Sequence, residues 1–130
     1  MGATRIPYSR CGDVLDARTL NRALLERQML LSSSNVPVGE ALEHLVGMQA
    51  QAPLAPYVGL WGRLEGFATD ELAALMVERK VVRTRVMRAT IHMVTTRDCL
   101  LLRSLMQSVV RRNFAGSEFA RKLRGLDIAI

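Results

Sequence analysis

Leucines recur at helical spacing near the start of the chain, in the segment DARTLNRALLERQMLL. Leu20, Leu24 and Leu31 stand at positions i, i+4 and i+11, which line one side of an α-helix. Asp16 precedes them and is a residue type that caps helix N-termini. The pattern predicts a first helix over roughly residues 16–31, which the following SSSN ends.

A second apolar stripe runs through NVPVGEALEHLVGMQ and predicts another helix, with Pro37 in its first turn. The stripe consists of Val38, Ala41, Leu42, Leu45 and Val46. Its next position, i+11, is Gln49, so an uncharged amide stands where the pattern asks for an apolar side chain. This makes the segment GMQAQAP a candidate site.

Two more helices are predicted before the pattern changes. One opens after Pro53 and Pro56, and its apolar side is made of Tyr57, Leu60, Trp61 and Leu64. The other begins near Thr69 and buries Leu72, Leu75 and Met76. Its acidic residues stand first and its basic residues last, the order that the helix dipole favours.

Beyond residue 80 the chain is rich in β-branched residues. VVRTRVM and TIHMVTT, separated by Arg88 and Ala89, read as the two strands of a hairpin. Alternation places Val81, Arg83 and Arg85 on one face of the first strand. A last helix, capped by Thr95 or Thr96, is expected to run to about residue 112.

These elements predict a mainly α protein with a small β-hairpin, of the α+β class. Three or four short helices followed by a two-stranded ribbon is the order of a winged helix-turn-helix domain. A chain of 130 residues with 49% hydrophobic composition can bury one core. We therefore expect residues 1–130 to form a single winged-helix domain.

Positive charge collects in the second half of the chain. Residues 1–78 carry 6 basic and 9 acidic side chains, whereas residues 79–130 carry 12 basic and 3 acidic ones. Such a basic half favours an anionic partner, double-stranded DNA before an acidic membrane surface. A basic face that is simply solvated is the alternative.

Cysteine and hydropathy patterns narrow the class of protein. Cys11 and Cys99 stand far apart without zinc-ligand spacing, so neither a metal site nor a disulfide framework is indicated. No segment approaches the roughly 18 apolar residues of a membrane span, and the N-terminus lacks the apolar run of a secretory signal. We expect a cytoplasmic monomer with no cofactor, no metal and no membrane partner.

Familiar catalytic arrangements are missing from the sequence. No serine has a glycine elbow with histidine and acid partners, and no glycine-rich loop resembles a phosphate cradle. His92 lies in a predicted strand, where it either makes a structural hydrogen bond or lines a functional site. Arg83, Arg85 and Arg88 on the hairpin suit contacts to DNA phosphates, with a role in solubility as the alternative.

Gln49 and Gln51 can converge only on an extended segment, because residues i and i+2 of a helix lie about 200° apart. Ala52 precedes Pro53, which biases it toward extended geometry. We expect the helix to end near Gln49 and both amides to turn toward one cavity. In the alternative, the amides only tie the helix end to the proline loop, since leaving one buried and unpaired costs roughly 1–3 kcal/mol.

Three runs in the sequence carry a resemblance to a known family: LNRALLERQMLL, GMQAQAPLAPYVGLWGRLEGF and VVRTRVMRATIHMVTTRD. Together they resemble the N-terminal part of the winged-helix DNA-binding-domain proteins that include the AlkZ-type DNA glycosylases. The resemblance extends over nearly all of residues 13–128. It implies a bacterial DNA-repair enzyme that hydrolyses the N-glycosidic bond of alkylated or crosslinked purines within a channel of tandem winged-helix units.

The resemblance also implies roles for particular residues. In that family a Gln-x-Gln or Gln-x-Asp motif is catalytic, and Gln49 and Gln51 match the first form. Arg88, Thr90 and His92 fall in a family-like segment and would support the site or face DNA. The family commonly has glycine where this chain has Ala89, which puts the tight turn in question.

Length is the main departure from the family, whose members run to several hundred residues. The resemblance therefore implies an N-terminal unit of a longer, nucleoid-associated protein, as a fragment, a truncated product or a stand-alone module, and leaves enzymatic activity of this chain open. A noncatalytic winged-helix regulator that binds DNA is the alternative function, and an incomplete domain without a function of its own is a third.

Overall fold

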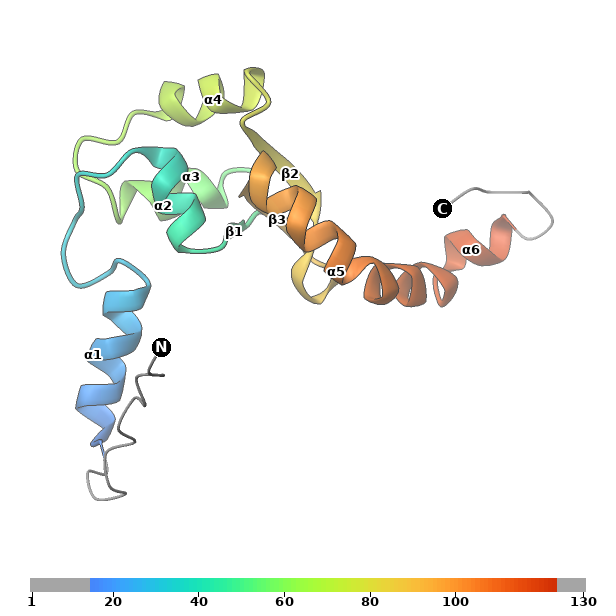
Figure 1. Cartoon of the computed structure of the whole chain (residues 1–130), viewed down its shortest axis with the longest axis horizontal. Helices are drawn as coiled ribbons and strands as arrows, with labels where there is room; N and C mark the ends of the chain where they lie inside the picture. The colour runs from blue at the N-terminus through green and yellow to red at the C-terminus, as the bar shows by residue number, and fades with distance from the viewer. Residues whose placement is uncertain (1–14, 124–130) are drawn as a thin grey trace, which may run out of the picture.

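A computed structural model describes residues 15–123 (Figure 1). In chain order its elements are α1 (Ala17–Arg27), α2 (Val38–His44), β1 (Met48–Gln49), α3 (Ala55–Trp61), α4 (Thr69–Val77), β2 (Val81–Arg85), the 3₁₀ turn η1 (Met87–Ala89), β3 (Ile91–Thr95), α5 (Thr96–Ala115) and α6 (Glu118–Lys122). The protein is mostly helical with one small antiparallel sheet, which confirms the α+β class.

The sheet contains the predicted hairpin and one strand that was not predicted. β2 pairs with β3 in antiparallel register, from Val81 opposite Thr95 to Arg85 opposite Ile91. β1 pairs with the other edge of β3, so the strand order is β1-β3-β2. The expected two-stranded ribbon is therefore a three-stranded sheet, with β3 in the middle.

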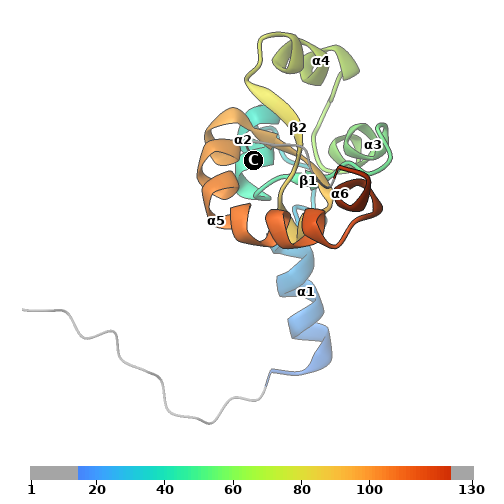
Figure 2. The same cartoon turned by 90° about the vertical axis from the view of Figure 1, so that its right-hand side faces the viewer.

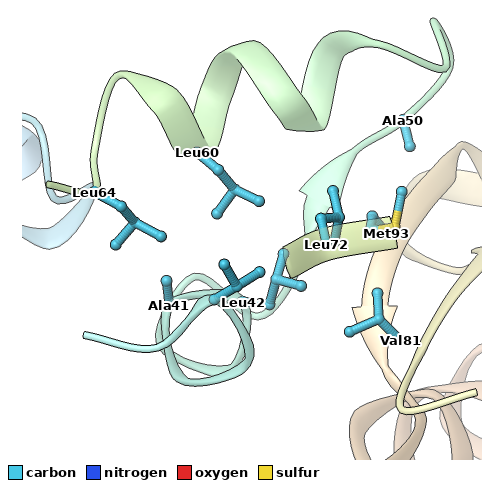
Figure 3. Packing of buried hydrophobic residues seen from close by; sticks show 9 residues of the cluster. Ala41, Leu42, Ala50, Leu60, Leu64, Leu72, Val81 and Met93 are labelled. Atoms are coloured by element: carbon cyan, nitrogen blue, oxygen red, sulfur yellow. The ribbon is translucent and has the colours of Figure 1, made fainter. Parts of the chain in front are cut away.

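The main core lies where α2, α3 and α4 meet one face of the sheet (Figure 3). Helix residues Leu42, Leu60 and Leu72 are fully buried beside Val81 of β2 and Met93 of β3. The prediction that Leu72 is buried is confirmed. Trp61 departs from the predicted stripe, because its side chain is 73% exposed.

The end of α2 decides where the glutamines lie. Val46 has φ 55° and Gly47 φ 91°, and the Gly47 N–H donates to the Leu42 carbonyl at 2.8 Å, as in a Schellman helix end. The helix thus stops at His44, before the apolar stripe predicted for it is complete. The helix end was expected near Gln49. It lies earlier in the chain, and Gln49 belongs to strand β1.

Gly47 brings β1 against β3. A Cβ at this position would lie 2.4 Å from Val94 Cγ1 and 2.8 Å from the Met93 carbonyl oxygen. Only a residue without a side chain can combine this close approach with a left-handed φ. The strand that carries Gln49 therefore depends on this glycine.

Helix α1 extends away from the core (Figures 1 and 2). Asp16 caps it as predicted, accepting from the Thr19 N–H at 2.7 Å, and hydrogen bonding to Thr19 lowers the pKa of its carboxyl. The helix ends at Arg27, earlier than expected. Its apolar side remains exposed, and Leu24 is 59% accessible.

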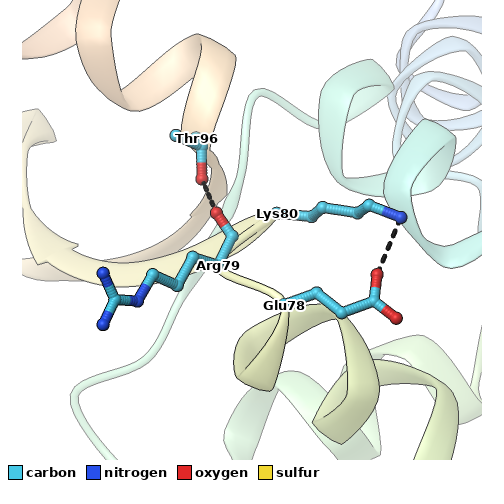
Figure 4. A network of polar contacts seen from close by, with 4 residues as sticks. All are labelled: Glu78, Arg79, Lys80 and Thr96. Atoms are coloured by element: carbon cyan, nitrogen blue, oxygen red, sulfur yellow. Dashed lines mark hydrogen bonds and ion pairs between the residues drawn. The ribbon is translucent and has the colours of Figure 1, made fainter.

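The open end of the hairpin is tied to its neighbouring helices (Figure 4). The hydroxyl of Thr96 donates to the Arg79 carbonyl, and the backbone N–H of Thr96 donates to the Lys80 carbonyl at 2.8 Å. Thr95 caps α5, as one of the two predicted alternatives, by accepting from the Asp98 N–H at 3.2 Å. α5 then continues along the hairpin, contacts η1, β2 and β3, and ends a little beyond the predicted residue 112.

Other sequence expectations are resolved only for the part of the chain that the structure describes. Within residues 15–123 no helix is long and apolar enough to span a membrane, and no cluster of potential metal ligands occurs. Cys99 is a free, half-buried thiol, whereas Cys11 and the rest of residues 1–14 lie outside the described residues.

Candidate functional site

Gln49 and Gln51 lie at the edge of the sheet, on a segment (residues 49–51) that we call the glutamine segment. Gln49 stands opposite His92 in the pairing of β1 with β3. Ala50 is fully buried in the core, whereas both glutamines are exposed. Strand alternation turns Gln49 to the face opposite Ala50, and Gln51 lies in the bend that follows β1.

The extended geometry of Gln49 agrees with the sequence expectation. A hollow of about 510 Å³ opens between α2 and α4, and the glutamines do not border it. It is lined by Pro37, Val38, Gly39, Glu40, Glu43, Glu71, Ala74 and Leu75. Both amides are exposed at the surface.

The hydrogen-bond ladder between β1 and β3 changes partners at Ala50. Its N–H donates to the Ile91 carbonyl at 2.8 Å, as in a regular antiparallel pair. In a regular pair the Ile91 N–H would donate to the Ala50 carbonyl, but here each of these groups has another partner. The Ile91 N–H donates to Gln51 Oε1 at 3.3 Å, and the Ala50 carbonyl accepts from Arg83 Nε at 2.9 Å.

This exchange gives the two glutamines different surroundings. The Gln51 oxygen faces the Ile91 N–H, since only an acceptor satisfies that donor, and this fixes the orientation of the amide. The Gln49 amide has no hydrogen-bond partner within residues 15–123. The alternative was that the glutamines only tie two segments of the chain together. Gln51 does so, but it binds β3 and not the proline loop.

Arg83 is the neighbour of the glutamine segment that sequence reasoning missed. Besides its bond to Ala50, its Nη2 lies 3.4 Å from the Gln51 carbonyl oxygen. Alternation puts Arg83 on the same face as Val81, which is buried in the core, but Arg85 shares that face, so the pattern alone does not distinguish the two arginines. A guanidinium on that face needs a protein acceptor or a route to solvent.

His92 and Thr90 are held by the hairpin itself. His92 is 5% exposed, and its Nδ1 lies 3.1 Å from the Thr90 carbonyl oxygen. A carbonyl can only accept, so Nδ1 is the donor of this bond. The Thr90 hydroxyl donates to the Met87 carbonyl at 3.0 Å and closes the turn.

Arg85 and Arg88 remain available at the surface. Both are exposed, and neither has an ion-pair or hydrogen-bond partner for its side chain among the described residues. Arg88 and Ala89 form the centre of the hairpin turn, with φ 52° and 56°. The structure thus separates the three hairpin arginines into one that contacts the glutamine segment and two that face solvent.

Comparisons with known proteins identify one family. Residues 42–129 match the family model described as DNA glycosylase AlkZ-like. This range covers more than half of the chain and includes the glutamine segment and the whole hairpin. Searches of curated proteins and of solved structures give no match.

Proposed function

Because the chain belongs to the AlkZ-like family of DNA glycosylases, we propose that it binds DNA and hydrolyses the N-glycosidic bond of alkylated purines, with Gln49 and Gln51 as catalytic residues. The observation that carries this proposal is the exposure of both amides at the sheet edge within the matched range, Gln49 on strand β1 and Gln51 two residues further on.

The chemistry suits neutral amides. An N7-alkylated purine is cationic and leaves with the electron pair of its bond to the sugar C1′, while a water oxygen forms the new bond to C1′ and loses a proton to solvent. A glutamine is not appreciably basic at neutral pH, but its carbonyl oxygen can hold this water and face the positive charge on the sugar. Amides also avoid the repulsion that carboxylates would suffer near phosphates.

We propose that the two residues divide this work. The Gln49 carbonyl oxygen is free to accept from the water, because no described residue occupies it. Gln51 keeps its NH₂ group and one lone-pair direction of its oxygen, since the other receives the Ile91 N–H. We therefore assign the water to Gln49 first and treat Gln51 as the amide of fixed orientation beside it.

We further propose that residues 38–95 form a winged-helix unit. Helix α2, strand β1, helices α3 and α4 and the hairpin follow one another in the order of such domains, and β1 joins the hairpin as the third strand. In this arrangement the hairpin is the wing. Its exposed Arg85 and Arg88 are the groups we assign to the DNA phosphates.

The noncatalytic regulator is less well supported. A helix-turn-helix regulator reads the major groove with the second helix of its motif, which here would be α4. The charged residues of α4 are Asp70 and Glu71, which stand in its first turn and would meet phosphates of like charge. Contact through the hairpin arginines positions DNA without reading its sequence.

The test is incubation with duplex DNA that carries one N7-alkylguanine, followed by alkali to cleave abasic sites. We expect cleavage at the lesion and none in the unmodified duplex. The double variant Q49A/Q51A should lose base release and largely keep its DNA affinity. Equal activity in the double variant would rule out the amides, and salt-dependent binding without base release from any alkylpurine would favour the regulator.

A further inference from the structure

We propose that Arg83 is a positioning residue that holds the glutamine segment in place, and not a contact to the DNA backbone. The structural part of this inference rests on the geometry around Ala50 alone. Its consequence for base release rests on the proposed function. Arg83 does not touch the reacting atoms, so it would act through Gln51.

The guanidinium of Arg83 bridges two successive carbonyls of the glutamine segment. Its Nε lies 2.9 Å from the Ala50 oxygen, and its Nη2 lies 3.4 Å from the Gln51 oxygen. A planar fork with donors at fixed angles can serve two neighbouring acceptors at once, which a lysine ammonium cannot do in the same geometry. Bonds from a charged donor are also stronger than those between neutral groups.

The exchange of partners at Ala50 links Arg83 to the Gln51 side chain. If Arg83 is removed, the Ala50 carbonyl loses its hydrogen-bond donor. The Ile91 N–H lies opposite this carbonyl in the ladder. A regular antiparallel bond between them would then form. It would take the Ile91 N–H from Gln51 Oε1 and release the Gln51 amide from β3. Arg83 thus determines which of two acceptors the Ile91 N–H takes.

Arg85 provides a matched comparison. It lies two residues further along β2 on the same face, is exposed as Arg83 is, and has no side-chain partner within residues 15–123. Replacing either arginine with methionine removes one positive charge and keeps a long side chain. Differences between R83M and R85M therefore report the contacts of Arg83 and not the loss of charge.

The first arm of the test is NMR spectroscopy of the whole chain without DNA. In the wild type we expect nuclear Overhauser contacts between the Ile91 N–H and the Gln51 side chain. R83M should lose these contacts and shift the Gln51 side-chain amide signals, R83K should shift them partly, and R85M should leave them unchanged. Gln51 signals that are the same in R83M, R83K and wild type would overturn the inference.

The second arm is single-turnover base release from N7-alkylguanine DNA with the protein in excess. We expect R83M to lower the rate by up to about 100-fold, the scale of a small misplacement of reacting groups. Its dissociation constant for DNA should stay close to that of the wild type, R83K should recover part of the rate, and R85M should raise the dissociation constant.

The two arms separate failure of the inference from failure of the proposed function. If R83M weakens DNA binding as R85M does, and its rate at saturating protein equals that of the wild type, Arg83 is a phosphate contact and the inference is wrong. If the wild-type protein releases no base, the proposed function fails, and the Gln51 signals in R83M and R83K still decide whether Arg83 positions the segment.

Discussion

Gln49 lies directly opposite His92 in the antiparallel pairing of β1 with β3, although the two residues come from distant parts of the chain. On the other side of β3, Thr84 faces the same histidine. The three side chains form a row across the sheet, with the buried His92 in the middle. The position of the Gln49 side chain therefore depends on the β2–β3 hairpin.

The two glutamines should differ in their contribution to stability. Gln51→Ala removes the acceptor of the Ile91 N–H and should lower the free energy of unfolding by about 0.5–1 kcal/mol. Gln49→Ala should change it by less than about 0.5 kcal/mol, because its exposed amide has no partner in the described residues. Urea denaturation followed by circular dichroism measures both. Equal losses in the two variants would contradict the partner exchange at Ala50.

Gly47 should tolerate no side chain. Gly47→Ala places a methyl group against Val94 and the Met93 carbonyl and strains a left-handed backbone, so we expect a loss of about 2–4 kcal/mol. Gly39→Ala is the control, because the new Cβ meets nothing within 4 Å and helix α2 should gain about 0.5–1 kcal/mol. The midpoints of thermal unfolding should move in opposite directions. A stable G47A protein would mean that β1 can leave β3 without cost.

The hairpin turn contains a residue that glycine would improve. Ala89 has φ 56°, a conformation that costs a residue with a Cβ roughly 1–2 kcal/mol and glycine almost nothing. Ala89→Gly should therefore stabilise the protein by about 1 kcal/mol. Ala74→Gly, on the exposed side of helix α4, should destabilise it by a similar amount. Thermal unfolding midpoints of the two variants distinguish relief of strain in the turn from the general effect of replacing alanine with glycine.

Arg85 and Arg88 should contribute to the salt dependence of DNA binding. Each contact to a phosphate releases counterions, so Arg85→Met and Arg88→Met should each reduce the slope of log affinity against log salt by about 1. Arg63→Met is the control, since this guanidinium donates to the Gln28 and Gly59 carbonyls at 2.8 Å and is engaged within the protein. Fluorescence anisotropy at several salt concentrations gives the slopes. An unchanged slope in R85M and R88M would place the DNA elsewhere.

The hairpin could be predicted from the sequence because its signal is local. Residues 81–87 and 90–96 are rich in β-branched side chains. The two turn residues, Arg88 and Ala89, fall between them, and both have positive φ values in the structure. Strand β1 could not be predicted, because two residues are too few to show a period. Its existence depends on Val94 and Met93, which approach Gly47 only in the folded chain.

The end of α2 and the role of Arg83 could not be predicted from the sequence, for two different reasons. Leu45 and Val46 continue the apolar stripe, so the periodicity runs past the true end, and a valine at φ 55° gives no sequence signal for a helix stop. An arginine on a strand reads as a contact to solvent or phosphate until its neighbours are known. Only the fold shows that residue 83 reaches the carbonyl of residue 50.

The placement of β1 has a consequence for how the protein opens. The glutamine segment is held by β3 through the ladder, by β2 through Arg83, and by the fit of Gly47 to Val94. A local opening of the hairpin removes all three supports at once, so we expect the segment and the hairpin to behave as one cooperative unit in hydrogen exchange. A substitution in the hairpin that increases this opening should then raise the hydrogen-exchange rate of the Ala50 N–H by the same factor.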